Sequence, residues 1–412
     1  FQAEDGIRDL VRSRGLGDVY KRQAIFFAAI IYIPKAMRVY NVVHLFDEDK
    51  IVKNFINMNK IFPTTPIKSS GKPHSFQTRD FELPASYSMD GKEYDMVEAL
   101  DYFKTDGLIV LHKGDLLYEN YWQGNSKDQP HISWSVAKSF LSALIGIAYH
   151  DGLIEDLSDP ITKYLNDFDD TGYANVPIKD ILQMSSGVIF NEDYADYNSD
   201  INKFARALAR GTSMRDFAKS LKNGKPPGTF NHYVSIDTQM LAMLLEEVTG
   251  QPVAQNLEEK IWTKIGMEYN AYYMVDDTGA AWALGGLNAT LRDYAKFGQL
   301  YLNNGKWGNK QIVPEEWVYA SFRPDGPHLE PGENELSSSP WGYGYQWWVP
   351  GFPSSDYLAS GIYNQYIYID PVTEVVIAKT SSNHKFNQER QYSKDAHVAM
   401  FRAIAIAVAS TL

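Results

Sequence analysis

The four residues Ser135-Val136-Ala137-Lys138 place a hydroxyl and an amine three residues apart, at the start of an apolar helical pattern. Residues i and i+3 lie on one face of a helix, so the Lys138 amine can reach the Ser135 hydroxyl. A serine becomes a good nucleophile when a neighbouring base takes its proton, and a desolvated lysine can be that base. The same spacing recurs at residues 69–72 and 382–385, but only Ser135 leads into a long apolar periodic segment, at 140–149. This context selects Ser135 as the candidate nucleophile.

The composition is that of a globular chain of enzyme size. The 412 residues are 44% apolar and 22% charged, a balance that supports one large core with two subregions. The net charge is -12 and no dense lysine or arginine cluster occurs, so we expect no nucleic-acid partner. The sequence contains no cysteine, which excludes disulfides, thiolate metal sites and thiol nucleophiles. The nine histidines form no H-x-H or H-E-x-x-H pair, so we expect no metal site and no other cofactor.

The N-terminal segment is interpreted separately. Residues 1–23 mix charges and glycines without a sustained period and resemble a translated sequencing adapter, so we expect an artefact there and exclude them from the fold prediction. Residues 24–33 are ten apolar residues, too few to span a bilayer. We expect residues 24–38 to be the remainder of a signal or anchor segment. The protein would then lie in the cell envelope, tethered to the membrane on the periplasmic face or secreted. The alternative is a buried N-terminal helix.

Turn and periodicity signals divide the rest of the chain. Prolines interrupt residues 39–90, which we expect to be an irregular lead-in. Residues 107–111 and 116–121 flank a Lys-Gly-Asp turn and predict a hairpin. From about 154 to 323 the pattern is mainly helical. Strand signals return at 343–349, 365–369 and 375–379, before an amphipathic helix at 395–409.

This order of elements predicts an α+β fold. One antiparallel sheet would be built from N- and C-terminal strands and flanked by helices, with the mostly helical region inserted between them. The Ser135 helix would lie at the seam between the two parts, where clefts usually form.

Two further motifs extend the pattern around Ser135-x-x-Lys138. Tyr233-Val234-Ser235 matches a Tyr-x-Asn/Ser element, and residues 283–298 match a long GG-x-x-x-T-x-x-D-x-x-x-F-G stretch. Together the motifs resemble the serine β-lactamase and penicillin-binding superfamily, nearest to class C enzymes, esterases of that fold and 6-aminohexanoate-dimer (nylon-oligomer) hydrolases. The resemblance implies a β-lactamase/transpeptidase-like domain at residues 91–412.

The family's third element is Lys-Thr-Gly on a strand that faces the serine, and two stretches compete for it. Residues 379–381, Lys-Thr-Ser, resemble it locally, but only Ser360-Gly361-Ile362 is followed by a turn, a strand and an acidic-Pro turn, as in the family. We assign the element there, with Ala359 in place of the lysine, and expect Lys379 to be solvated near the end of a later strand. The missing lysine would have bound a β-lactam carboxylate. We therefore expect ester or linear-amide hydrolysis rather than efficient β-lactam hydrolysis.

The resemblance implies a role for each matched residue. Ser135 would be the nucleophile, Lys138 the base in acylation, and Tyr233 the partner that relays a proton and activates water in deacylation. The backbone N–H groups of Ser135 and Ile362 would hold the oxyanion. The alternatives are a helix-capping serine, a solvated lysine and an ordinary aromatic in a chain with 27 tyrosines.

The resemblance also implies a substrate side, formed by Tyr194, Ser235, Ser360 and Gly361. Tyr194 would contact the leaving amide, although a loop aromatic is the alternative. Ser235 would hydrogen-bond to Lys138 or to substrate.

The function that these residues indicate is a serine hydrolase that cleaves a small ester or linear amide through an acyl-enzyme. The alternative is a membrane-tethered penicillin-recognising or peptidoglycan-binding protein with little turnover. No G-x-S-x-G elbow occurs, which disfavours a Ser-His-Asp hydrolase of the α/β type. The oligomeric state stays open.

Overall fold

A seven-stranded antiparallel sheet, in the order β11-β12-β13-β14-β15-β4-β5, forms the centre of the computed structural model, which describes residues 2–351 and 354–411. The predicted hairpin is present as β4 (Thr105–His112) and β5 (Asp115–Tyr121), joined by a turn in which Lys113 and Gly114 have positive φ. The other strands come from the C-terminal part: β11 (Gly342–Tyr343), β12 (Trp348–Val349), β13 (Tyr357–Gly361), β14 (Gln365–Asp370) and β15 (Val375–Ser381). The prediction of one sheet built from both ends of the chain is confirmed.

Helices cover both faces of this sheet. Helix α10 (Leu291–Leu302) packs on β4, β14 and β15, and a β-carbon added at its Gly298 would lie 2.5 Å from Val376, so the helix approaches the sheet closely. The C-terminal helix α12 (Arg390–Thr411) covers the opposite face with Phe401 and Ile404, both fully buried. The apolar stripe predicted at 395–409 therefore belongs to a longer core helix.

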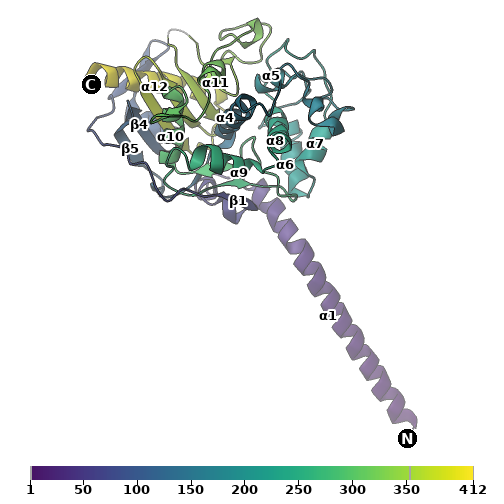
Figure 1. Cartoon of the computed structure of the whole chain (residues 1–412). Helices are drawn as coiled ribbons and strands as arrows, with labels where there is room; N and C mark the ends of the chain where they lie inside the picture. Colours follow the sequence, from purple (N-terminus) through teal and green to yellow (C-terminus); the bar gives the residue numbers. More distant parts are fainter. Residues whose placement is uncertain (1, 352–353, 412) are drawn as a thin grey trace.

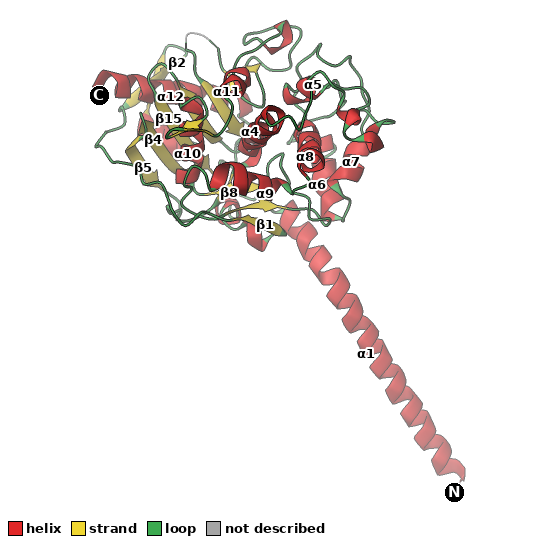
Figure 2. Cartoon of the chain, viewed as in Figure 1, coloured by secondary structure: helices red, strands yellow, loops and turns green. Residues whose placement is uncertain are grey.

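The helical part of the chain lies beside the sheet, and α4 (Ala137–His150) runs between the two parts (Figure 2). Its elements are α5 (Ile178–Leu182), α6 (Asp200–Ala209), α7 (Met214–Ser220), α8 (Ser235–Thr249), α9 (Val253–Leu257), a π-turn (Glu258–Trp262) and α11 (Glu315–Ser321). Short 3-10 turns occur at Ile161–Lys163, Asn166–Phe168 and Pro327–Leu329.

Two details of the predicted chain order differ in the structure. The region from 154 to 323 is mainly helical, as expected, but it also contains β7 (Ala271–Met274) and β8 (Leu287–Ala289), which join β1 (Thr64–Ile67) and β6 (His131–Ile132) in a four-stranded sheet. A small hairpin of β9 (Lys306–Trp307) and β10 (Lys310–Gln311) follows α10. The signal at 343–349 is not one strand, because β11 and β12 fold back on each other around Gln346, whose φ is positive.

The stretch before β4 contains short elements between its prolines. They are α2 (Ile51–Phe55), a 3-10 turn (Met58–Lys60), β1, and the hairpin of β2 (Ser86–Met89) and β3 (Lys92–Asp95), followed by α3 (Met96–Tyr102). Leu45, Phe55 and Phe62 are buried in the main core, so this segment is part of the packed body.

The N-terminal helix α1 (Gln2–Val43) projects away from that body (Figure 1). Ile25, Phe26 and Phe27 are exposed on it, so the alternative of a buried N-terminal helix is wrong. Among the described helices, none combines the length and the apolar character needed to cross a membrane.

Candidate active site

Ser135 lies in a 3-10 turn, Trp134–Val136, that runs directly into α4. Trp134 has a positive φ of 45°, a conformation that costs energy in a residue with a β-carbon. Its indole packs against Phe46 and Phe55, with ring centroids 5.6 and 5.5 Å away, and this aromatic cluster holds the turn in place. Ser135 is half-buried and borders two cavities, so its hydroxyl is accessible to a small molecule.

The other two Ser-x-x-Lys matches have different surroundings. Residues 69–72 lie in an irregular segment, and Ser382 donates a hydrogen bond to buried Asp106 in a loop after β15. Neither match leads directly into a helix. Two histidines lie close in sequence to the motifs. His131 Nε2 is 2.9 Å from Asp106, and His232 Nε2 is 2.8 Å from the Phe190 carbonyl, so both make structural contacts.

Lys138 is fully buried in the first turn of α4, and its amine faces the nucleophile. Its Nζ donates to Ser135 Oγ at 3.3 Å, to Ser235 Oγ at 3.3 Å and to the carbonyl of Leu284. Burial lowers the pKa of Lys138 to about 7, although the negative charge of Glu192 acts to raise it. A substantial fraction of the amine is therefore neutral near pH 7 and able to accept the proton of Ser135.

Tyr233 lies just before α8, with its ring stacked on Trp348 at a centroid distance of 5.4 Å. Lys138 Nζ is 5.2 Å from the centre of the same ring. Burial raises the pKa of the Tyr233 phenol, Glu192 raises it further, and hydrogen bonding with Ser135 opposes the rise. Tyr233 is thus protonated near neutral pH, in the form that can donate a proton.

Glu192, which no motif marks in the sequence, lies beside Lys138 in the structure. This carboxylate is buried, and it accepts hydrogen bonds from Ser235 Oγ and, at 2.9 Å, from the Tyr194 hydroxyl. Ser235 therefore accepts a hydrogen bond from Lys138 and donates one to Glu192. The Glu192-Asp193-Tyr194 stretch was visible in the sequence, but no spacing rule links it to residues more than forty positions later.

Replacing Glu192 with Gln should shift the pH dependence of catalysis. The amide keeps a hydrogen-bond acceptor for Ser235 but removes a negative charge that raises the pKa of Lys138. The acidic limb of the kcat/KM profile should therefore move to lower pH, by roughly one unit. A pH profile from 5 to 9 with an ester substrate measures this shift. Asp193→Asn, at the exposed neighbouring carboxylate, is the matched control and should leave the limb in place. If the acidic limb stays in place in the Glu192→Gln variant, the charge of Glu192 does not set the pKa of Lys138.

Strand β13 and the turn after it bring Ser360, Gly361 and Ile362 to the nucleophile. A β-carbon added at Gly361 would lie 2.5 Å from the Ser133 carbonyl oxygen and 3.1 Å from the Ser135 nitrogen, so only glycine permits this approach. Ser135, Gly361 and Ile362 line the same cavity, whereas Ala359 is buried within the strand. Ile362, the residue expected to supply the second oxyanion donor, lies in the turn directly after β13.

Lys379 is not solvated, contrary to expectation. It is 1% exposed in β15, where its amine donates to Ser381 Oγ, and burial lowers its pKa to about 7. The strand pairs on both sides, which encloses the side chain between the sheet and its covering helix. Lys379 is not among the described residues that border either cavity at Ser135.

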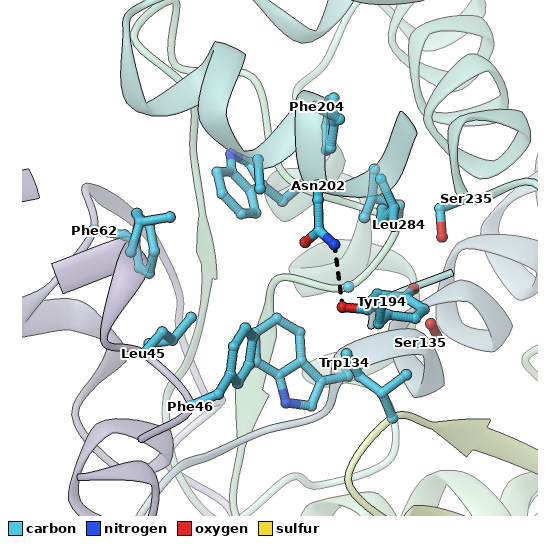
Figure 3. Close-up of a pocket in the computed structure, with 16 residues that line it drawn as sticks. Leu45, Phe46, Phe62, Trp134, Ser135, Tyr194, Asn202, Phe204, Ser235 and Leu284 are labelled. Atoms are coloured by element: carbon cyan, nitrogen blue, oxygen red, sulfur yellow. Dashed lines mark hydrogen bonds between the residues drawn. The ribbon is translucent and has the colours of Figure 1, made fainter. Parts of the chain in front are cut away.

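Two cavities meet at Ser135. The first, drawn in Figure 3, holds roughly 720 Å³ of space including its mouth and has mostly apolar walls. We call it the apolar lobe; it is lined by Val42, Leu45, Phe46, Phe62, Trp134, Ser135, Tyr194, Ile201, Asn202, Phe204, Ala205, Ser235, Trp282, Leu284, Gly285 and Ile362. The second, which we call the cationic lobe, is lined by Ser135, Tyr194, Tyr233, Trp348, Ser360, Gly361, Ile362, Phe386, Arg390 and Lys394. Replacement of the motif lysine by Ala359 therefore does not leave the pocket without basic side chains, because α12 supplies Arg390 and Lys394.

The sheet with its inserted helical part, and a buried lysine against an accessible serine, define a serine hydrolase of the amidase and esterase type. The chain belongs to the Beta-lactamase family, whose model matches residues 95–399. In the part of the chain that the structure describes, no group of three or more His, Cys, Asp or Glu side chains could hold a metal ion.

Named relatives agree with this class. The 6-aminohexanoate-dimer hydrolase of Paenarthrobacter ureafaciens is 30% identical over 296 residues, 70% of this chain and 75% of the relative. A Bacillus anthracis structure named as a candidate 6-aminohexanoate-dimer hydrolase superimposes with a TM-score of 0.78 at 28% identity, covering 87% of this chain and 95% of that one. A teichoic acid D-alanine hydrolase of Staphylococcus aureus (strain MRSA252) is 22% identical over 304 residues, 70% of this chain and 72% of the relative.

Proposed function

We propose that this protein hydrolyses a small ester or linear amide through an acyl-enzyme on Ser135, with Lys138 and Tyr233 as the base system. The observation that carries the proposal is the fully buried Lys138 amine, 3.3 Å from Ser135 Oγ and with a pKa lowered to about 7 by burial. A relative named for hydrolysis of 6-aminohexanoate dimer, a linear amide, supports the substrate class.

Each step of the proposed reaction has a candidate group among the residues around Ser135. Ser135 Oγ attacks the carbonyl carbon and its proton passes to Lys138, while the backbone N–H groups of Ser135 and Ile362 stabilise the oxyanion. The bond to the leaving amine or alcohol breaks as Tyr233 donates a proton to it, and Lys138 returns a proton to Tyr233. Water then attacks the acyl-enzyme, and its proton reaches neutral Lys138 through the Tyr233 hydroxyl. Lys138 returns a proton to Ser135 Oγ as the acyl–oxygen bond breaks, which releases the carboxylic acid and free Ser135. Tyr194, Ser235, Ser360 and Gly361 would form the substrate side.

A substrate panel tests this proposal. p-Nitrophenyl esters and 6-aminohexanoate dimer should be hydrolysed, whereas kcat/KM for nitrocefin should be lower than for the best ester by about 100-fold or more. The reason is that Ala359 leaves β13 without the motif's lysine, and the basic side chains of the pocket, Arg390 and Lys394, come from α12 instead. D-amino-acid amides complete the panel as the substrates closest to the D-alanine-releasing relative. Nitrocefin turnover at the rates of β-lactam resistance enzymes would contradict the proposed preference.

The non-turnover alternative and the cellular location are tested separately. The relatives described above are named as hydrolases, which favours turnover over a penicillin-recognising protein. Steady-state product release beyond one equivalent per site would exclude the alternative, and a burst that stops at one equivalent would support it. The similarity to a relative named teichoic acid D-alanine hydrolase supports a location in the cell envelope, which fractionation of the native host would test.

A further inference from the structure

The apolar lobe has a wall that the family model does not cover. Val42, Leu45, Phe46 and Phe62 line it, and all precede residue 95, where the family match begins. Phe46 is fixed by stacking on Tyr363, with ring centroids 4.7 Å apart and planes 17° apart. The wall is therefore an ordered part of the pocket, supplied by the end of α1 and by the residues that follow it, of which Leu45, Phe46 and Phe62 are labelled in Figure 3.

The apolar lobe suits an uncharged group. Of the described residues that line it, none is charged. Its Asn202 amide already donates to the backbone carbonyls of Tyr194, at 3.1 Å, and Asp196, at 2.8 Å. An ammonium group placed deep in this lobe would lose its water without gaining a counter-charge, which is strongly unfavourable. An alkyl or aryl chain would instead gain from burial.

The cationic lobe suits an anion. Arg390 and Lys394 are four residues apart on α12, so their side chains lie on one face of the helix and both border the lobe. Lys394 Nζ lies 4.5 Å from the ring centre of Trp348, and the Arg390 guanidinium 5.5 Å from that of Tyr194. No carboxylate occurs among the described residues lining this lobe. Burial and the charge of Arg390 lower the pKa of Lys394 to about 7, opposed by Asp395, and a bound anion would raise it again.

The position of Tyr233 orients a substrate between the lobes. Ser135, Tyr194 and Ile362 border both lobes, so the scissile carbonyl lies at their junction. Tyr233 borders only the cationic lobe. Because the leaving group must receive its proton from Tyr233 in the proposed mechanism, the leaving group lies in the cationic lobe and the acyl group in the apolar lobe.

We infer that the preferred substrate is an amphiphilic amide in which an uncharged apolar acyl group is joined to an amine that carries a carboxylate. This inference rests on the proposed function. Hydrolysis consumes one water. Ser135 Oγ forms a bond to the acyl carbon, the carbon–nitrogen bond breaks, and the amino acid leaves with a proton delivered by Tyr233. Water then cleaves the acyl ester to give the free fatty or aryl acid.

Three amides, each built from two six-carbon chains, test both ends of the proposed substrate. N-hexanoyl-6-aminohexanoate has the apolar acyl end and the carboxylate, 6-aminohexanoate dimer adds an ammonium to the acyl end, and N-hexylhexanamide lacks both charges. We expect kcat/KM for N-hexanoyl-6-aminohexanoate to exceed both others by about tenfold or more. p-Nitrophenyl hexanoate is run beside them as an independent test of the serine hydrolase itself. Equal kcat/KM values for the three amides, in an enzyme that hydrolyses p-nitrophenyl hexanoate, would overturn the inference and leave the proposed function intact. If the enzyme hydrolyses neither the ester nor the amides, both the inference and the proposed function are wrong.

Substitutions in each lobe test which lobe binds the acyl end of the substrate and which binds its carboxylate end. Arg390→Gln combined with Lys394→Gln should lower the ratio of kcat/KM for N-hexanoyl-6-aminohexanoate over N-hexylhexanamide by about tenfold or more, because the anion loses its partners. Lys385→Gln, an exposed lysine before α12 that borders neither lobe, should leave that ratio unchanged. Ala205 is half-buried and lines the apolar lobe. Ala205→Asp should raise kcat/KM for 6-aminohexanoate dimer relative to N-hexanoyl-6-aminohexanoate, because the carboxylate would pair with the ammonium of the dimer. Unchanged ratios in folded variants would contradict the assignment.

Discussion

Replacing Ser135 with Ala is expected to reduce ester and amide hydrolysis by about 10,000-fold or more and to abolish labelling by a fluorophosphonate probe. Alanine removes the only atom that bonds to the acyl group in the proposed mechanism, while the half-buried position tolerates the smaller side chain. The fold should persist, because Ser135 Oγ makes a hydrogen bond to Lys138 rather than a core contact. Steady-state kinetics, probe labelling and thermal unfolding of the same preparation measure these three effects.

Ser69→Ala is the matched control for this variant. Ser69 begins another Ser-x-x-Lys match, and it lines neither lobe. Its substitution should leave turnover and labelling at wild-type levels. Persistent labelling of a folded Ser135→Ala protein would mean that a different residue is the nucleophile.

Replacing Lys138 with Met should lower kcat/KM by about 1,000-fold or more, because the site loses the base that accepts the Ser135 proton. Methionine fills a similar volume, so the loss would not stem from a large cavity in α4. Buried Glu192 loses its nearby cation and becomes easier to protonate, since Lys138 acts to lower the pKa of that carboxyl. The variant should therefore also lose the acidic limb near pH 7 that titration of Lys138 imposes on the wild type. Single-turnover acylation by a p-nitrophenyl ester across pH 5–9 measures both effects.

Lys379→Met controls for the loss of a buried lysine and decides between the two alignments of the third element. Lys379 is as buried as Lys138, and burial lowers its pKa to about 7 as well, but it borders neither lobe. We expect Lys379→Met to keep nearly wild-type kcat/KM. A loss as large as that of Lys138→Met would place the third element at 379–381 instead of 360–362.

Much of the fold could be predicted because its signals are local or follow chain order. The Lys113-Gly114 turn requires positive φ, and it joins two runs of strand-forming residues, so the β4–β5 hairpin could be predicted from the sequence. Pairing of β4 with β15, more than 250 residues later, followed from placing strands from both ends of the chain in one sheet. The pairing of β1 with β7 left no comparable signal, because short strands next to prolines look like loops.

Only the site residues that belong to sequence motifs could be predicted. Ser135, Lys138, Tyr233 and Gly361 carry recognisable spacing, and the structure brings them together. Glu192 could not be found this way, since its contacts with Ser235 and Lys138 depend on how a loop folds over α8. The cations of α12 and the wall at Leu45 and Phe46 were missed for the same reason, because each lies far in sequence from every motif. Lys379 was misjudged because the position of a lysine near a strand end does not reveal whether a helix covers that strand.

The acyl-enzyme itself is the most direct test of the account. The protein is mixed with a slowly deacylating p-nitrophenyl ester, quenched in acid within one turnover, digested and analysed by tandem mass spectrometry. We predict one acyl group per chain, on the peptide that contains Ser135 and on its Oγ, with none in Ser135→Ala. An acyl group on another residue, or rapid hydrolysis with no covalent adduct at any quench time, would contradict the central claim.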